Sequence, residues 1–162
     1  MKHTNILLYL SIVLLIVSLS TGCANSSSQI QDSLHNYSQM IAGNIPEDVC
    51  LTIYYLDPSI LTYSPLSVDD LMNFSETQKI IVESEELVAN FEPFKKLDIS
   101  ELKPAREKTY VDARLYYVLN AGDSGNLLEA VITQTNYNVI LNGIEAEYNP
   151  IFHELVAAFL PK

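Results

Sequence analysis

The chain has 162 residues, of which 48% are apolar and 18% are charged, a balance typical of one packed domain rather than a disordered chain. It carries 9 Lys and Arg against 20 Asp and Glu, for a net charge of −11. This charge repels phosphate backbones, and no cluster of Lys and Arg offsets it, so the composition argues against nucleic-acid binding. A basic protein or peptide is the kind of partner that such a charge attracts.

The N-terminus has the three parts of a secretory leader. A short polar start containing Lys2 precedes an apolar run over residues 6–19, interrupted only by Ser11 and Ser18. A membrane-spanning helix needs about 20 apolar residues, and this run is shorter. Its length instead fits the hydrophobic region of a signal peptide.

The leader ends in Leu19-Ser20-Thr21-Gly22-Cys23. This segment resembles the lipobox of bacterial lipoproteins, with one departure, because Ser20 stands at the position where Leu is usual. The resemblance implies lipidation of the Cys23 thiol and cleavage between Gly22 and Cys23. Two acyl chains would anchor the protein stably, so we expect it on the extracytoplasmic face of the cell membrane or the outer membrane.

The sequence therefore divides into three parts. Residues 1–22 are expected to form the lipoprotein signal peptide, and residues 23–29, which are polar and uncharged, a flexible tether. Residues 30–162 are expected to form a single globular domain.

The first half of this domain alternates helices and strands. Apolar residues at helical spacing predict a helix from Ile30 that ends at Gly43. The elements expected next are a strand over 49–56, a short capped helix from Ser67 to about 73, a strand over 79–83, and a helix capped by Ser84 with a break at Pro93.

The second half reads as four strands followed by a helix. Strands are expected over 110–119, 127–135, 138–141 and 144–148, with Asn142-Gly143 as a type I′ turn. A C-terminal amphipathic helix should begin at Asn149-Pro150 and extend through Leu160. The fold class that follows is α+β: an antiparallel sheet of about five to six strands with amphipathic helices packed on one face.

The strand period of two assigns side chains to the two faces of this sheet. The helix-covered face should collect Val49, Leu51, Ile53, Tyr55, Val111, Ala113, Leu115 and Tyr117. The opposite face should collect Thr52, Tyr54, Asp112, Arg114, Tyr116, Glu129 and Thr133. We expect Asp112 and Arg114 to pair across a solvated surface, and we take Tyr54, Asp112, Arg114 and Tyr116 as the candidate binding face.

No known catalytic motif is complete. His153-Glu154 begins like a zinc-protease motif, but Ala157 stands where the second histidine is needed. No group of cysteines and histidines has metal-ligand spacing, so no metal or cofactor is expected. Cys50 has no partner if Cys23 is lipidated, and it is expected to be a small buried apolar residue.

These observations predict a membrane-anchored extracytoplasmic lipoprotein with a non-enzymatic binding or accessory domain. Its expected partners are the membrane, through the lipid, and a protein or peptide, for which the charge favours a basic one. Two alternatives stay open. One is an envelope hydrolase that uses dispersed carboxylates. The other is an inhibitory or neutralising module that captures a basic protein.

Overall fold

The computed structural model describes residues 27–43, 45–107, 110–122, 125–134 and 138–161. The leader and the lipobox, with Gly22 and Cys23, lie outside these residues. Within the described part of the chain, no helix is both long enough and apolar enough to cross a membrane.

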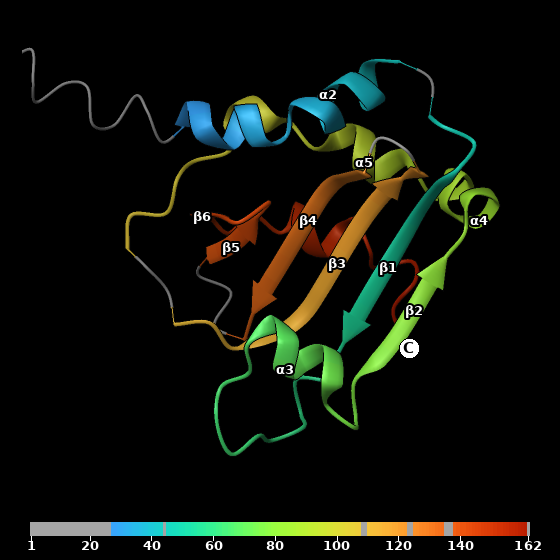
Figure 1. Cartoon of the computed structure of the whole chain (residues 1–162). Coiled ribbons are helices and arrows are strands. Elements are labelled where there is room, and N and C mark those ends of the chain that lie inside the picture. Colours follow the sequence, from blue (N-terminus) through green and yellow to red (C-terminus); the bar gives the residue numbers. More distant parts are fainter. Residues whose placement is uncertain (1–26, 44, 108–109, 123–124, 135–137, 162) are drawn as a thin grey trace, which may run out of the picture.

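The centre of the domain is a sheet of six antiparallel strands in the order β2-β1-β3-β4-β5-β6 (Figure 1). The strands are β1 (Val49–Tyr55), β2 (Gln78–Val82), β3 (Ala113–Ala121), β4 (Gly125–Thr133), β5 (Asn138–Leu141) and β6 (Ile144–Glu147). The α+β class and the antiparallel sheet predicted from the sequence are confirmed.

The turn between β5 and β6 has the predicted type I′ geometry. Asn142 and Gly143 have φ values of 46° and 81°, as both central residues of this turn require. The Asn142 side chain also links three segments, because its Oδ1 accepts from the Glu129 N–H (2.7 Å) and its Nδ2 donates to the Ser33 carbonyl (2.6 Å).

The helices are short, and along the chain they precede, separate or follow the strands. They are α2 (His35–Ala42), α3 (Val68–Asn73), α4 (Ser84–Ala89), α5 (Glu92–Lys96), the 3-10 helix η1 (Ile99–Glu101) and α6 (Ile151–Glu154). Residues 27–33 are helical as well, so the segment assigned to a flexible tether is already helical over residues 27–29.

Two of the predicted helix signals are confirmed and two are wrong. Ser67 and Asp70 form the expected capping box, and α5 begins with Pro93 in its first turn. Ser84, however, is not a cap: Glu83 holds that position, and the Ser84 hydroxyl donates to the Val49 carbonyl (2.7 Å). The C-terminal helix ends at Glu154, and turns replace it up to residue 159.

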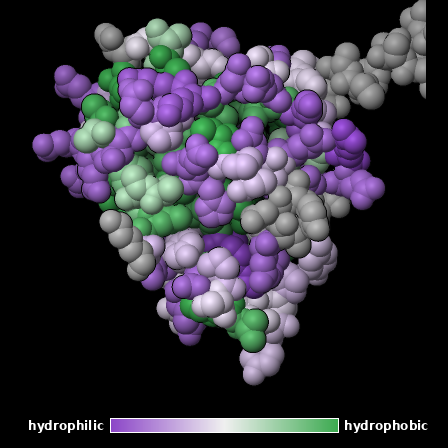
Figure 2. Space-filling view, turned by 180° about the vertical axis from the view of Figure 1, so that it is seen from behind, coloured by the Kyte–Doolittle hydropathy of each residue, from purple (hydrophilic) through white to green (hydrophobic). Residues whose placement is uncertain are grey.

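The main core lies between one face of the sheet and most of the helices. Buried side chains from residues 30–42, α4, α5 and α6 pack there against Leu51, Ile53 and Tyr117. The two tyrosine hydroxyls buried in this layer are both satisfied, since Tyr37 donates to the Phe94 carbonyl and Tyr117 to the Phe152 carbonyl (3.0 Å). Seen from behind, the outer surface is mainly hydrophilic, with apolar side chains visible in the gaps (Figure 2).

The opposite face of the sheet is also covered, but only in part. A second cluster of buried side chains forms there, and it includes Leu71 of α3 together with Leu56, Leu66 and Tyr116. Figure 1 shows α3 in front of the sheet, at the end where β1 finishes. One of the helices thus lies on the face that the sequence leaves to solvent.

A β-bulge explains where the assignment of faces fails. On β3 the partners advance from Ala113 to Leu115, while on β4 they advance only from Thr133 to Ile132, so Arg114 is an extra residue. Leu115 and Tyr117 face the main core as predicted, but Val111 and Ala113 belong to the second cluster. Their assignment to the helix-covered face was wrong, because alternation breaks at the bulge.

Candidate functional site

The segment between β1 and α3, residues 57–66, forms a loop at one end of the sheet; we call it the 57–66 loop (Figure 1). It begins with a turn in which the Asp57 carboxylate accepts from the Ser59 N–H (2.8 Å). Hydrogen bonds from Ser59 lower the pKa of the Asp57 carboxyl. The carbonyl of Asp57 accepts from the Ile60 N–H (2.9 Å), and the Ile60 side chain packs against the second cluster.

The Arg114 side chain forms hydrogen bonds with the middle of this loop. Only 5% of the residue is exposed, and its guanidinium donates to the Ile60 carbonyl (3.0 Å) and to the Thr62 hydroxyl (3.0 Å). It also donates to the Gln134 side chain (3.3 Å). The fixed fork of donors in a guanidinium suits several simultaneous contacts of this kind, so the bulged arginine ties the loop to β3 and to the end of β4.

Asp112 fixes the end of the loop and pairs with the same arginine. One carboxylate oxygen accepts from the Leu66 N–H (3.1 Å), and the other lies 3.1 Å from an Arg114 nitrogen. The backbone adds a further bond, from the Ala113 N–H to the Leu66 carbonyl (2.8 Å). The predicted pair of Asp112 and Arg114 therefore exists, but its side chains are only 16% and 7% exposed, so the expectation of a solvated pair was wrong.

The loop carries two large apolar side chains that point into solvent. Leu61 is 89% exposed and Tyr63 is fully exposed, on either side of the anchored Thr62. Isolated exposed apolar residues are common on protein surfaces. Here, however, two stand almost together on a loop that partly buried hydrogen bonds from Arg114 and Asp112 hold in place. Leu and Tyr side chains presented on an anchored loop are suited to insertion into a pocket of another protein.

The other two residues of the predicted binding face lie side by side on the sheet. Tyr54 and Tyr116 are register partners, and their rings stack with centroids 5.9 Å apart. Lys79 places its ammonium 5.4 Å from the centre of the Tyr54 ring. Burial, with a contribution from nearby Glu129, raises the pKa of the Tyr116 hydroxyl to about 12.

The structure therefore brings the four residues of the candidate face onto one side of the sheet but gives them different exposures. Tyr116 and Arg114 are buried, at 9% and 5% exposure, under α3 and the loop. Thr133, expected on the solvated face, is buried as well. These side chains lie beneath the 57–66 loop, on which Leu61 and Tyr63 present apolar groups to solvent.

Leu61 and Tyr63 are not among the residues that the sequence predicts for the binding face. They lie in a stretch bounded by Pro58 and Pro65, in which turn-forming residues predominate. The signal that could have identified them is the presence of two large apolar side chains in a segment whose turn-forming residues predict neither a strand nor a helix.

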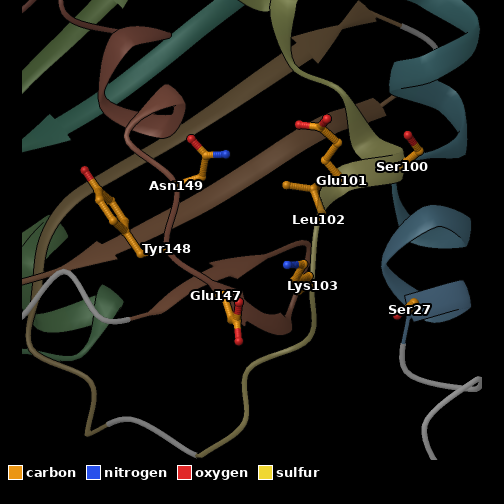
Figure 3. Close-up of a pocket in the computed structure, with 8 residues that line it drawn as sticks. All are labelled: Ser27, Ser100, Glu101, Leu102, Lys103, Glu147, Tyr148 and Asn149. Atoms are coloured by element: carbon orange, nitrogen blue, oxygen red, sulfur yellow. The ribbon is translucent and has the colours of Figure 1, made fainter.

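A separate hollow of about 590 Å³ lies near the start of the described chain (Figure 3). Of its two carboxylates, Glu101 and Glu147, the second already pairs with Arg106 at 3.0 Å. Small-molecule sites are mostly enclosed and apolar. This hollow is shallow and polar, so it fits a ligand site poorly. Its lining consists of Ser27, Ser100, Glu101, Leu102, Lys103, Glu147, Tyr148 and Asn149.

The remaining reactive side chains stand apart from one another. His153 is half-buried in α6, and burial lowers its pKa. Cys50 is partly exposed rather than buried as expected, with its thiol free. Among the described residues, no three His, Cys, Asp or Glu side chains are grouped so that they could hold a metal ion.

No protein-family model matches this chain, and no curated protein or solved structure is significantly similar to it.

Proposed function

We propose that this protein is a lipid-anchored extracytoplasmic protein that binds a partner protein through the 57–66 loop. The observation that carries the binding role is the exposure of Leu61 and Tyr63 on a loop that is held by buried Arg114 and by partly buried Asp112. A loop ordered before binding loses less conformational entropy when the complex forms. Tyrosine is among the residues that most often dominate binding energy.

The position of the loop agrees with an anchor at the N-terminus. The helical residues 27–42 lie toward the end of the sheet where β1 begins, and the loop lies at the end where β1 finishes (Figure 1). A chain held by lipid on Cys23 would therefore present the loop away from its own membrane. The partner would then be a protein or peptide rather than the lipid surface to which the chain is anchored.

Charge indicates the chemistry of this partner. The loop begins with Asp57 and is followed by Asp69 and Asp70 at the start of α3. The whole chain is strongly acidic, at −11. A complementary surface would have an apolar pocket for Leu61 and Tyr63 and basic residues around it.

The carboxylates give no reason to prefer the hydrolase alternative. Among the described residues, the Asp and Glu side chains whose pKa is shifted are Asp57, Asp70, Glu92 and Asp98. In each, hydrogen bonds from a neighbour in the sequence lower the pKa, the opposite of the shift that a general acid needs.

The binding role is tested by capture from detergent-solubilised membranes with the full lipidated chain. We expect a partner that is retained by the native protein and lost with the double variant Leu61→Ser/Tyr63→Ser. The matched control is Val88→Ser, which removes a 50%-exposed apolar side chain from α4 at the other end of β1. Equal capture by all three proteins would refute the loop as the binding surface.

Salt and mass measurements complete the test. Capture that disappears at high salt while Leu61→Ser/Tyr63→Ser has no effect would instead favour a neutralising module that works by charge alone. For the anchor, intact-mass analysis should find two acyl chains on Cys23 and no leader. A free Cys23 thiol, or a leader still attached, would contradict the lipoprotein assignment.

A further inference from the structure

The two edge strands of the sheet, β6 and β2, differ in whether their outer backbone groups have a partner. Beside β6, the segment 103–105 supplies backbone partners, since the Glu147 N–H donates to the Lys103 carbonyl (2.8 Å) and the Ala105 N–H to the Glu145 carbonyl (3.1 Å). Beside β2, no strand or bridge among the described residues pairs with the outer side. An unpaired edge is a template for a further strand.

The backbone groups that face outward from β2 can be identified from the register. The Leu56 N–H donates to the Arg114 carbonyl (2.9 Å), so even-numbered residues of β1 point their backbone groups toward β3. Odd-numbered residues then point toward β2, in agreement with the Ser84 hydroxyl bonded to the Val49 carbonyl.

The partners of the odd residues on β2 are even-numbered, as in the pairs of Leu51 with Val82 and of Ile53 with Ile80. The outward backbone groups on β2 therefore belong to the alternate residues Lys79 and Ile81, with Glu83 continuing the line. Glu83 is still extended, with φ −81° and ψ 166°.

The side chains of these three residues make the edge self-complementary. All three are exposed, and Ile81 is 60% exposed although it is apolar. If a second copy pairs antiparallel about Ile81, Ile81 meets Ile81 of the second copy, and Lys79 meets Glu83 of the second copy at both ends.

The other two-fold registers that use outward-facing groups are less favourable. Centring on Ile80 places Lys79 opposite Ile81, and centring on Val82 places Glu83 opposite Ile81, so each separates a charge from its partner. Centring on Lys79 or on Glu83 places like charges directly opposite, which is destabilising. The charges therefore select the register centred on Ile81.

We propose that β2 is a dimerisation edge, at which a second copy of this chain adds antiparallel about Ile81 and joins two six-stranded sheets. The two Ile81 residues exchange a pair of N–H to carbonyl bonds across the two-fold axis. The Glu83 N–H donates to the Lys79 carbonyl of the second copy, while the Glu83 carbonyl already accepts from the Leu87 N–H (2.9 Å) within α4.

This contact is small compared with the interfaces of stable dimers. Pairing should therefore be weak and reversible for dilute protein. It should be favoured where copies are held close together, as they would be on a membrane under the proposed lipid anchoring. The cross-linking expected in the membrane therefore rests on the proposed anchoring, whereas pairing of concentrated protein in solution does not.

Cysteine cross-linking of the full chain in its native membrane tests the register. Directly opposed residues in a hydrogen-bonded antiparallel pair lie about 5.5 Å apart at Cα, which suits a disulfide. In a Cys50→Ser background, Ile81→Cys should give a disulfide-linked dimer on mild oxidation. Lys79→Cys and Glu83→Cys should each cross-link poorly alone and well when the two variants are expressed together.

Val88→Cys is the control, because this side chain is exposed and belongs to α4, outside the β2 edge. Cross-linking of Val88→Cys as strong as that of Ile81→Cys would show random collision and overturn the proposal. Absence of an Ile81→Cys dimer in the membrane would also overturn it, as would stronger cross-linking of Lys79→Cys alone than of the mixed pair.

Charge exchange gives an independent measurement. In the Ile81→Cys protein, Lys79→Glu should reduce dimer formation several-fold, and the double change Lys79→Glu/Glu83→Lys should restore it. Circular dichroism should show the same fold for each variant, since both side chains are exposed. Leu61→Ser/Tyr63→Ser should leave the cross-link unchanged, so failure of the loop proposal and failure of the dimer proposal are distinguishable.

Discussion

The two faces of the sheet are stabilised in different ways. The main core is a continuous apolar layer in which side chains from residues 30–42, α4, α5 and α6 cover strand residues. The second cluster is smaller, lies at one end of the sheet, and is bordered by the charged pair of Arg114 and Asp112. The first face depends on packing, whereas the second depends on hydrogen bonds that order a loop.

The main core therefore determines the stability of the domain, whereas the second face determines how the 57–66 loop is presented. Shortening one side chain in the main core should lower the free energy of unfolding strongly, because a cavity remains in a close-packed interior. The second face holds polar contacts whose main effect is on one loop. We therefore expect substitutions on the two faces to differ in how far their effects spread.

The largest effect is expected on the helix-covered face. Leu51 is fully buried between β1 and the helices, and Leu51→Ala should lower the free energy of unfolding by about 3–5 kcal/mol. The neighbouring change Thr52→Ala, on the opposite and partly exposed face, should cost less than about 1 kcal/mol. Urea unfolding followed by circular dichroism measures both. Similar losses at the two positions would contradict the contrast between the faces.

A smaller and more local effect is expected for Arg114→Met. Removing one partner of a buried ion pair typically costs about 3–5 kcal/mol. Here Asp112 keeps the Leu66 N–H, and the Arg114 Nε is buried without a hydrogen-bond partner among the described residues. Both facts reduce the loss, so we expect about 2–3 kcal/mol.

The distinguishing measurement for Arg114→Met is the order of the 57–66 loop. Hydrogen exchange at Ile60 and Leu66 should accelerate more than exchange in β1, because the loop opens without the sheet. Arg106→Met is the matched control: it removes an arginine whose pair with Glu147 is exposed, and it should be nearly neutral. Uniform acceleration across the sheet would show that Arg114 supports the whole domain instead.

Much of the fold followed from local rules in the sequence. The capping box at Ser67, the break at Pro93 and the turn at Asn142-Gly143 are decided by residues within a few positions of one another. The predicted C-terminal helix, which extends through Leu160, is longer than the observed helix α6, which ends at Glu154. Apolar spacing over residues 151–160 fits a helix, but the backbone turns after Glu154 while Phe159 and Leu160 still reach the core.

The surface was harder to predict because it depends on one bulge and one covering segment. Strict alternation predicts Ala113 on the helix-covered face, but it belongs to the second cluster, and it predicts a solvated Arg114, which is buried. Nothing in the local sequence marks the extra residue of the bulge. The cover over Tyr116 comes from α3, more than forty positions earlier in the chain. Long-range coverage of this kind is set by packing and has no periodic signature.

The smallest expected effect concerns the buried tyrosines at alkaline pH. Burial raises the pKa of the hydroxyls of Tyr37 and Tyr117 on the helix-covered face, and of Tyr116 on the other face, the last to about 12. An unfolded tyrosine has a pKa of about 10. Above that pH the unfolded chain releases protons that the folded chain retains, so stability falls as pH rises from about 10 toward the raised values.

Tyrosinate absorbance and circular dichroism, recorded in one alkaline titration, separate the two faces. Tyr117→Phe should remove absorbance that develops together with unfolding, because this phenol is completely buried and bonded to the Phe152 carbonyl. Tyr116→Phe should remove absorbance that begins before the sheet unfolds, because its cover is a single helix and a loop. Loss of the same late absorbance in both variants would mean that Tyr116 is protected from solvent as completely as Tyr117. The two faces of the sheet would then not differ in how they are stabilised.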